Sequence, residues 1–473
     1  MRVWYRSSPA AAARAGWLAG AFYYGILVSW SWYFGAVAIV PFVAVLAAYW
    51  ALTGAGIAAC TRRSRGQPVV SAAVWVLGEG LLARWPLGGF SWGEIGYAFH
   101  DVPALRAVAA VGGVPLLSFL AALVNATLAN LSLDRRGDAL RRRAWSQGTP
   151  AVVLVGAAVV IAALLGEPAT GRPFRYALVQ GNNLNRDLTA AEEAAGLLPE
   201  QHFALAASLR GDFDLIVFPE STFLDAPNAP DPAFAEFDWP ERLAGLARRH
   251  TSYVLANGTG DAPDGRALNL DVLWDPRGVE VGEYAKRHLV PYGEWVPFRS
   301  ALEGLVDELD QIPRDFAPGA TRGLFDLGGI PAATVICFES MFGAEVRPLV
   351  ADGAELIVVS TNNRSYRRSA NSEQHVAGSQ MRAAEMGRPV LHASISGISA
   401  VIDANGTVLD RQPLFRNGVV QGTITTRTGS TPYVRYGDWI AQFSLFAIAA
   451  LAAETFVRLA RARLRRWSAV RVP

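Results

Sequence analysis

Charged side chains are scarce in this chain of 473 residues. Only 18% of the residues are charged, 51% are hydrophobic, and the net charge is +2. A net charge so near zero gives no electrostatic basis for binding nucleic acid, and this composition is unlike that of a disordered chain or an ordinary soluble protein. The composition therefore favours a membrane protein that carries a sizeable soluble part.

Long apolar stretches lie near both ends of the chain. Five fill the first third and a sixth follows the soluble part, at residues 16–34, 36–59, 68–84, 104–131, 150–166 and 437–457. Each approaches or exceeds the ~20 apolar residues that a helix needs to cross a bilayer. The sequence therefore predicts six spans, of which the third and fifth are short. The first stretch has no small-residue cleavage site, so we expect an uncleaved anchor.

Arginine clusters in the short connections predict the orientation. They comprise Arg2, Arg6 and Arg14; Arg62, Arg63 and Arg65; Arg135, Arg136, Arg141, Arg142 and Arg143; and Arg458, Arg461, Arg463, Arg465 and Arg466. All four clusters fall on one side if every stretch crosses, and basic loops mark the cytoplasm. The aromatic connection 85–103 has no basic residue and is expected at the opposite interface, as an aromatic belt or a lipid-handling loop.

Residues 172–430 have the pattern of an α/β domain. Short apolar runs occur at 175–181, 214–220, 253–259, 267–275, 332–339, 354–363 and 389–397, and such runs suit strands buried on both faces. Helices are expected near 240–250, begun by Pro240, and at 372–387, capped by Ser372. The predicted order is a membrane domain (1–171) with about five helices, this domain outside the cytoplasm, and a last helix with a basic cytoplasmic tail (431–473).

Cysteine occurs only twice, at Cys60 and Cys337. The predicted topology puts the two on opposite sides of the membrane, so they cannot approach to the ~6 Å between Cα atoms that a disulfide requires. Cys337, in "TVICFES" (334–340), is either a nucleophile or a small core residue. Burial and the nearby Glu339 would both raise the pKa of its thiol, so a nucleophilic Cys337 needs a positive neighbour or a base.

Lysine occurs once among 43 basic residues, as Lys286. Arginine cannot replace a compact ammonium, so a lysine kept in a chain that otherwise uses arginine indicates a specific role, unless it remains by chance. Glu220 ends the apolar run 214–220 after Pro219 and is expected to project from a strand end. It is a candidate proton acceptor for Cys337, or else a solvated loop residue.

The motifs around these three residues resemble those of the nitrilase superfamily. "VFPES" contains Glu220, "YAKRHLVPYGEWVPF" contains Lys286, and "ICFES" contains Cys337. Together with the membrane spans, "GEWVPF" and "GGFSWGEIGY" (88–97) resemble one branch in particular, the apolipoprotein N-acyltransferases of bacterial membranes. The resemblance covers nearly the whole chain. The sequence contains no HExxH, no CxxC and no phosphate-binding glycine loop.

The resemblance implies a fold and a reaction. The fold is a multi-span helical membrane domain joined to an αββα sandwich on the outer face of the bacterial cytoplasmic membrane. Cys337 would attack the sn-1 ester of a phospholipid acyl donor, with Glu220 as the base and Lys286 at the oxyanion. The resulting thioester would acylate the α-amine of a diacylglyceryl-cysteine lipoprotein, without metal, cofactor or nucleotide.

Other residues receive roles through the same resemblance. Glu294 and Glu339 match supporting carboxylates of the family. Trp295, Phe298 and Phe338 are expected to contact substrate, and water exclusion by the first two and the 85–103 loop would favour transfer to an amine over hydrolysis. Trp295 and Phe298 could equally be core residues.

The chain departs from the family in two places, and two other functions stay open. It looks two helices shorter at its start, and Asn363 stands where many members have an aspartate, which leaves catalysis intact but bears on acceptor binding. A membrane-tethered amidase acting on a small C–N substrate would use the same three residues. A non-catalytic scaffold would use none of them.

Overall fold

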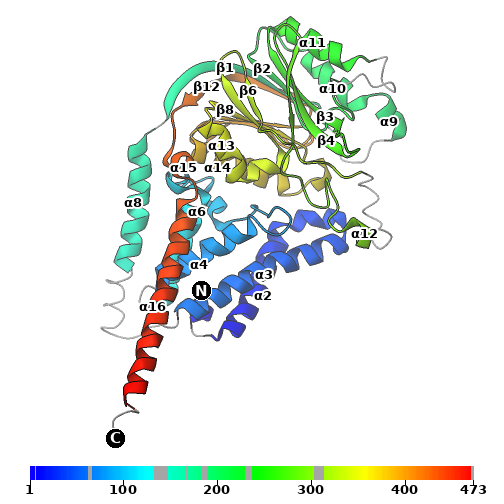
Figure 1. Cartoon of the computed structure of the whole chain (residues 1–473). Helices are drawn as coiled ribbons and strands as arrows, with labels where there is room; N and C mark the ends of the chain where they lie inside the picture. The colour runs from blue at the N-terminus through cyan, green and yellow to red at the C-terminus, as the bar shows by residue number, and fades with distance from the viewer. Residues whose placement is uncertain are drawn as a thin grey trace.

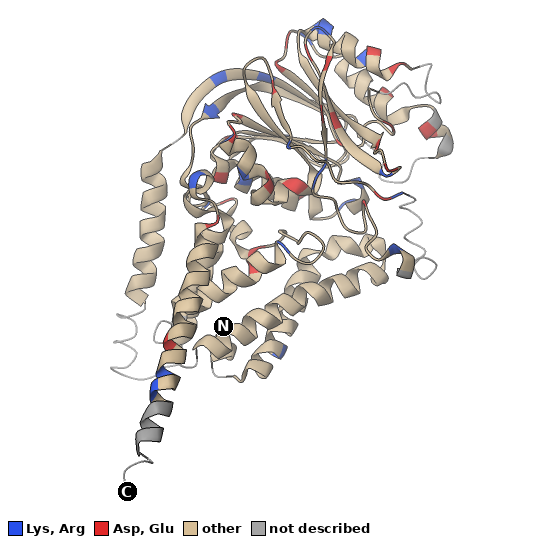
Figure 2. Cartoon of the chain, viewed as in Figure 1, with Lys and Arg blue, Asp and Glu red and all other residues tan. Residues whose placement is uncertain are grey.

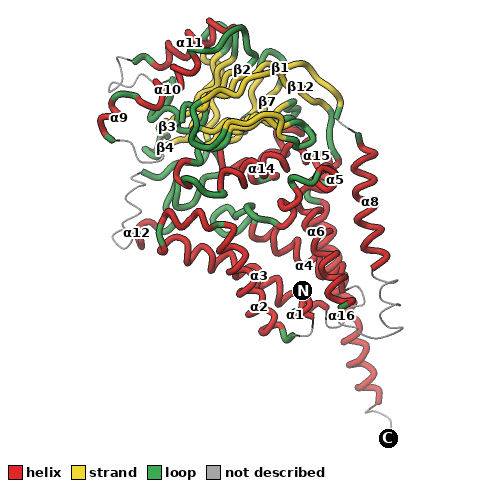
Figure 3. Tube along the Cα trace, turned by 180° about the vertical axis from the view of Figure 1, so that it is seen from behind, coloured by secondary structure: helices red, strands yellow, loops and turns green. Residues whose placement is uncertain are grey.

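Helices and strands separate into two parts of the molecule (Figures 1 and 3). The computed structural model describes residues 1–5, 7–61, 67–132, 148–166, 168–182, 189–228, 237–302 and 314–469. All the strands lie in the sandwich formed after residue 168, and the long apolar helices extend from one side of it.

The helical part precedes the sandwich, except for its last helix. It contains α1 (Arg2–Tyr5), α2 (Pro9–Leu27), η1 (Ser29–Phe34), α3 (Ala36–Thr61), α4 (Gln67–Leu82), η2 (Ile95–Phe99), α5 (Pro103–Arg106), α6 (Ala109–Leu131), α8 (Thr149–Leu165) and α16 (Trp439–Ala469). The first predicted span, 16–34, is misplaced. Ser8 caps α2 by accepting from the Ala11 amide, Pro9 begins the helix, and a 3₁₀ segment replaces it after Val28.

Three of the described helices are long and apolar enough to cross a membrane: Ala36–Thr61, Ala109–Leu131 and Trp439–Ala462. Pro68–Leu82 and Thr149–Leu165 are shorter apolar helices, which agrees with the two short stretches in the sequence. The structure thus has a helical region with three candidate spans, and the count of six stays a prediction. No charged residue lies along α3 or α8, whereas charges gather on the sandwich and near the end of α16 (Figure 2).

Two six-stranded sheets form the sandwich, in the orders β12-β1-β2-β3-β4-β5 and β11-β10-β9-β8-β7-β6. The first sheet contains β1 (Ala169–Gln180), β2 (Leu215–Phe218), β3 (Tyr253–Asp261), β4 (Ala267–Trp274), β5 (Glu280–Ala285) and β12 (Gly418–Thr428). The second contains β6 (Leu324–Asp326), β7 (Pro331–Ile336), β8 (Leu356–Thr361), β9 (Val390–Ser394), β10 (Ser399–Ile402) and β11 (Val408–Gln412). In each sheet three strands run parallel, β1-β2-β3 and β7-β8-β9.

The layers confirm the αββα sandwich. An apolar core that includes Phe174, Leu215, Leu356 and Leu391 fills the space between the sheets. Outside the first sheet lie α9 (Ala190–Ala194), α10 (Leu197–Ala206) and α11 (Trp239–His250), and a second core joins α10 and α11 to the sheet. Outside the second lie α13 (Gly343–Ala351), α14 (Asn371–Met386) and α15 (Pro432–Tyr436). Each sheet is thus buried on both faces at its centre, as the continuous apolar runs predict.

All seven strands predicted from apolar runs are present, and β5, β6, β10, β11 and β12 were not predicted. β11 shows why, because three of its five residues are exposed and its sequence is Val-Leu-Asp-Arg-Gln. The cap predicted for α14 is wrong: the helix begins at Asn371 after Ala370, so Ser372 lies inside the first turn. Pro240 does lie in the first turn of α11, which Asp238 caps by accepting from the Glu241 amide.

The helical part holds the sandwich through direct contacts. The indoles of Trp30 and Trp92 both donate to Gln374 Oε1, at 3.0 and 2.8 Å, and the Tyr97 hydroxyl donates to the Met341 carbonyl at 2.9 Å. The 85–103 connection therefore covers the sandwich where Cys337 lies, since Met341 ends the turn that Cys337 begins. Membrane sidedness stays a prediction, because Arg6, Arg62, Arg63, Arg65, Arg135, Arg136, Arg141, Arg142 and Arg143 lie outside the described residues.

Candidate active site

Glu220, Lys286 and Glu294 form a buried ionic group at one end of the first sheet. Glu220 lies two residues after β2, Lys286 directly follows β5, and Glu294 lies in the loop beyond it. The Lys286 ammonium donates to Glu294 Oε1 at 2.8 Å and approaches Glu220 Oε1 at 3.4 Å. Its side chain is only 1% exposed. Three charges far apart in sequence are thus assembled out of contact with bulk water.

Further donors fix the two carboxylates. The Asn269 amide donates to both, to Glu220 Oε1 at 2.8 Å and to Glu294 Oε1 at 3.0 Å. The Asn362 backbone N–H donates to Glu220 Oε2 and the Val290 backbone N–H to Glu294 Oε2, each at 2.7 Å. A buried charge is stable only when it is paired and hydrogen-bonded, and these contacts meet that condition.

The charge of Lys286 is secured by its neighbours. Burial alone would lower the pKa of the ammonium, but Glu294 and Glu220 outweigh burial and hold that pKa well above its usual value. An ammonium has three N–H donors, so the contacts to Glu294 and Glu220 leave one for a third acceptor. A positive donor of this kind can stabilise an oxyanion.

Cys337 lies at the end of β7, where the chain turns into the 3₁₀ segment η6 (Cys337–Met341). Its φ is +53°, in the left-handed region that non-glycine residues rarely adopt, and such strain is concentrated at functional sites. Burial first, and then the Glu220 charge, raise the pKa of its thiol to about 12, although Lys286 acts in the opposite direction. The thiol is therefore protonated at neutral pH, so a base must remove its proton as it attacks.

The Glu339 carboxylate is engaged by donors other than the thiol, and burial and Glu220, not Glu339, raise the pKa of Cys337 most. The carboxylate accepts from the Tyr284 hydroxyl, at 2.9 and 2.8 Å, and from the backbone N–H groups of Arg287, His288 and Ile336. Glu339 is fully buried and ties the turn after β7 to the segment after Lys286. It supports the site geometry instead of opposing ionisation of Cys337.

The three predicted substrate-contacting aromatic residues occupy different environments. Phe298 is 74% exposed and has a φ of +58°, whereas Trp295 is half-buried. Phe338 is buried and packs against Phe90 of the 85–103 connection, with ring centroids 6.2 Å apart. Phe298 is therefore free to meet a lipid or a partner, while Phe338 lies against the wall that the helical part provides.

Several residues at the site were missed from the sequence. Asn269 and Asp271 are polar residues at alternate positions of the otherwise apolar β4, and this was the available signal. Asp271 accepts from Asn257 at 3.0 Å and from Thr334 at 2.7 Å, and burial raises its pKa to about 7. Tyr366 packs edge-on against Trp30, with ring centroids 4.8 Å apart, and burial first and then Cys337 raise its pKa. No pattern indicated Tyr366.

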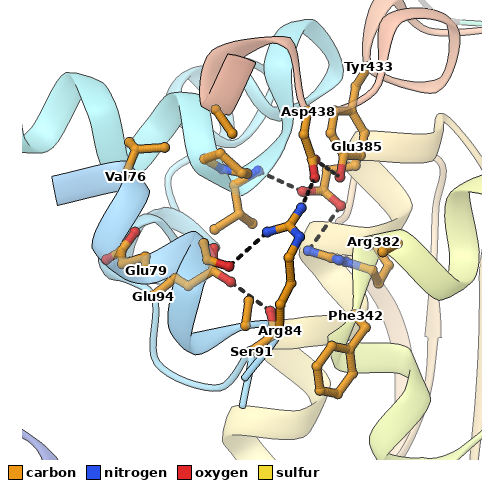
Figure 4. A pocket seen from close by; sticks show the side chains of 17 residues that line it. Val76, Glu79, Arg84, Ser91, Glu94, Phe342, Arg382, Glu385, Tyr433 and Asp438 are labelled. Carbon is orange, nitrogen blue, oxygen red and sulfur yellow. Dashed lines mark hydrogen bonds and ion pairs between the residues drawn. The ribbon is translucent and has the colours of Figure 1, made fainter. Parts of the chain in front are cut away.

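A cavity of about 70 Å³ lies apart from these residues, where the helical part meets the sandwich (Figure 4). Ion pairs cross this contact or border it, between Arg84 and Asp438 at 2.6 Å and between Arg382 and Glu385 at 2.9 Å. Glu385 Oε1 also accepts from the Val114 N–H of α6 at 2.6 Å. Glu220, Lys286 and Cys337 do not line this cavity.

Ser91, which lines the same cavity, belongs to a motif that was wrongly taken to be absent from the sequence. Residues 89–93 read Gly-Phe-Ser-Trp-Gly and match the G-x-S-x-G pattern of serine hydrolases. That pattern requires a strand-to-helix turn, but Ser91 lies in the connection between α4 and η2, and its hydroxyl donates to Glu94 at 2.6 Å. Ser91 is therefore no nucleophile elbow.

Family comparisons agree with both parts of the molecule. The carbon-nitrogen hydrolase family model matches residues 175–433, and the model of the apolipoprotein N-acyltransferase N-terminal domain matches residues 1–127. The apolipoprotein N-acyltransferase of Methylococcus capsulatus is 35% identical over 93% of this chain and 87% of its own length. The chain belongs to the apolipoprotein N-acyltransferase family. That of Geobacter metallireducens is 31% identical over 96% of this chain and 88% of its own length.

Members of this family are acyltransferases of lipoprotein maturation, and membership makes this chain an enzyme of that class and a membrane protein. Among solved structures, an amidase of the nitrilase superfamily from Nesterenkonia AN1 is similar, with 19% identity and a TM-score of 0.36 over 56% of this chain and 94% of that one. Among the described residues, no group of three or more His, Cys, Asp or Glu side chains is arranged to hold a metal ion.

Proposed function

We propose that this enzyme transfers an acyl chain from a glycerophospholipid to the α-amine of an N-terminal diacylglyceryl-cysteine, through a thioester on Cys337. The observation that carries the proposal is the buried group of Glu220, Lys286 and Glu294 together with a strained cysteine, Cys337, whose thiol pKa is raised by burial first and then by the Glu220 charge. In this arrangement a thiol, a base and an oxyanion donor act on one carbonyl carbon.

In the first half-reaction Cys337 Sγ attacks the sn-1 ester carbonyl while Glu220 takes the thiol proton. The carbonyl oxygen becomes an oxyanion and accepts the remaining N–H of the Lys286 ammonium. When the ester C–O bond breaks, Glu220 returns the proton to the glycerol oxygen and a lysophospholipid leaves. The acyl chain stays on Cys337 as a thioester.

In the second half-reaction the lipoprotein amine attacks the thioester carbonyl and gives one proton to Glu220. The C–S bond then breaks, an amide forms, and Cys337 recovers a proton. Glu294 and Asn269 do not change bonds in either step. They hold Lys286 and Glu220 at fixed distances, which keeps the reorganisation during the reaction small.

Membrane placement supports the choice of a lipid donor. Three helices suited to a membrane lie in the same chain, and the 85–103 connection covers the turn that bears Cys337. We also propose that the sandwich lies outside the cytoplasm, with the C-terminus inside, on the basis of the arginine clusters. In this proposal the membrane domain is residues 1–171, the catalytic domain is residues 172–430, and the last helix with its cytoplasmic tail is residues 431–473. Trp295, Phe298 and Phe338 would contact the donor or the acceptor.

The test uses the full chain in mixed micelles, with phospholipid carrying a labelled sn-1 chain and a synthetic diacylglyceryl-cysteine peptide. The expected result is the label in amide linkage on the peptide, at a rate that depends on Cys337. Release of ammonia from small amides, with no label on the peptide, would instead establish the amidase alternative. An equal transfer rate in Cys337→Ala would show that the domain is not the catalyst.

A further inference from the structure

His375 of α14 is a fully buried histidine that the acyl-transfer steps do not use. Its Nε2 lies 3.1 Å from the carbonyl oxygen of Cys337 and 2.8 Å from the Ser340 hydroxyl. The Ser340 hydroxyl itself donates to the Cys337 carbonyl at 2.8 Å. The side chains of His375 and Ser340 therefore both contact the backbone carbonyl of Cys337.

The contacts of the other ring nitrogen fix the position of the imidazole proton. Nδ1 lies 3.1 Å from the amide nitrogen of Asn363, and the same nitrogen donates to Asn371 Oδ1 at 2.8 Å, which sets the orientation of the amide. An amide nitrogen only donates, so Nδ1 must accept and the proton must be on Nε2. Burial lowers the pKa of His375 to about 4, so the ring is neutral at physiological pH.

The Nε2–H therefore points at the Cys337 carbonyl and Ser340, and this contact orients the peptide that follows Cys337. The Cys337–Phe338 peptide is planar and trans, so holding its C=O toward His375 turns the Phe338 N–H to the opposite side. Phe338 is the second residue of the 3₁₀ segment, and the first N–H groups of such a segment have no partner within it. The same contacts also stabilise Cys337 in its left-handed conformation.

We propose that His375, as the neutral Nε2–H tautomer selected by Asn363, is a positioning residue for acyl transfer. It fixes the peptide after Cys337 so that the thiol and the Phe338 N–H face the same substrate carbonyl. The identity of the substrate rests on the proposed function, whereas the tautomer of His375 and its contact with the Cys337 carbonyl do not.

Asn363 selects this tautomer because its side chain is an amide, whose nitrogen donates, and not a carboxylate. A carboxylate at this position could only accept, so it would draw the proton to Nδ1 or make the ring an imidazolium. In the first case Nε2 would present a lone pair to the Cys337 carbonyl, and that contact would be lost. In this chain Asn363 therefore keeps the proton on the side of the nucleophile.

The experiment compares His375→Gln with His375→Asn in the full chain. The glutamine amide nitrogen reaches the position of Nε2, while that of asparagine reaches only the position of Nδ1, so the pair differs in where the donor lies. The readouts are the alkylation rate of Cys337 by iodoacetamide, followed on its own peptide to exclude Cys60, the acylation rate from phospholipid, and Tm.

We expect His375→Gln to keep both rates within about threefold of wild type, and His375→Asn to lose about 10- to 100-fold, the effect of misplacing a nucleophile by a fraction of an ångström to 1 Å. Equal losses in the two variants, tracking equal falls in Tm, would overturn the proposal and leave His375 a packing residue. A loss of rate in His375→Gln but not in His375→Asn would also overturn the proposal.

A second measurement reads the tautomer itself. Nitrogen chemical shifts of ¹⁵N-histidine-labelled protein, with the His375 signal assigned through the substituted variants, should show Nε2–H in wild type and Nδ1–H or imidazolium in Asn363→Asp. Nδ1–H in wild type would overturn the inference. If wild type forms no acyl adduct at all, the proposed function fails, and the alkylation rates and chemical shifts still decide the role of His375.

Discussion

The single lysine gives the sharpest prediction, through Lys286→Arg, a substitution that keeps the charge. The ammonium is held between Glu294 Oε1 at 2.8 Å and Glu220 Oε1 at 3.4 Å and is almost fully buried. A guanidinium is longer and planar and prefers to pair with one carboxylate through two N–H groups. It would therefore displace Glu220 or Glu294 and lose the donor aimed at the oxyanion.

Loss of one oxyanion donor costs about 2.7–4 kcal/mol of transition-state stabilisation, or roughly 10²–10³ in rate. Displacement of the base would add to this loss. The assay follows the appearance of an acyl mass on Cys337 by intact-mass spectrometry after mixing with phospholipid. The matched control is Arg277→Lys, whose side chain is 80% exposed and pairs with Asp275. A Lys286→Arg rate within threefold of wild type would refute the argument from the compact ammonium.

Three further substitutions test the electrostatics. Glu220→Gln should abolish acylation yet shift the pH profile of Cys337 alkylation to lower pH, because the Glu220 charge raises the pKa of the thiol. An unshifted profile would show that the Glu220 charge does not act on the Cys337 thiol. Glu339→Gln should lower Tm and slow alkylation, because either orientation of the amide sets an NH₂ against N–H donors, at about 1–3 kcal/mol for a lost partner; an unchanged Tm would contradict this. Asp271 has a raised pKa of about 7, so the folded state binds its proton more tightly than the unfolded state and stability falls as pH rises from about 4 to 7. Asp271→Asn should reduce that fall in Tm, and the same slope in both proteins would show that Asp271 is not its source.

The apolar runs predicted an α/β domain, because its central strands are buried on both faces, whereas the αββα arrangement was implied by the family resemblance alone. The runs missed the edge strands β5, β6, β11 and β12, which keep exposed residues, and also β10, which is buried but only four residues long. In the helical part, composition located the apolar stretches, but the end of α2 depended on a local change to a 3₁₀ turn that hydropathy does not record.

The site shows a similar division. A lysine that occurs once and a cysteine at a strand end could be singled out from the sequence, and the structure brings Lys286 and Glu220 into contact. The partners of the Glu339 carboxylate could not be predicted, because a separation of two residues from Cys337 does not tell which groups the side chain meets. His375 could not be predicted either, because it reaches the Cys337 carbonyl only through the packing of α14 against η6 and β9.

In the proposed reaction an acyl chain is held on Cys337 between the two steps. The decisive measurement is the intact mass of the full chain after incubation with phospholipid and no acceptor. We expect one added acyl chain, located on the Cys337 peptide, absent from Cys337→Ser and discharged when the diacylglyceryl-cysteine peptide is added. No adduct on wild type, or the same adduct on Cys337→Ser, would contradict the proposed reaction.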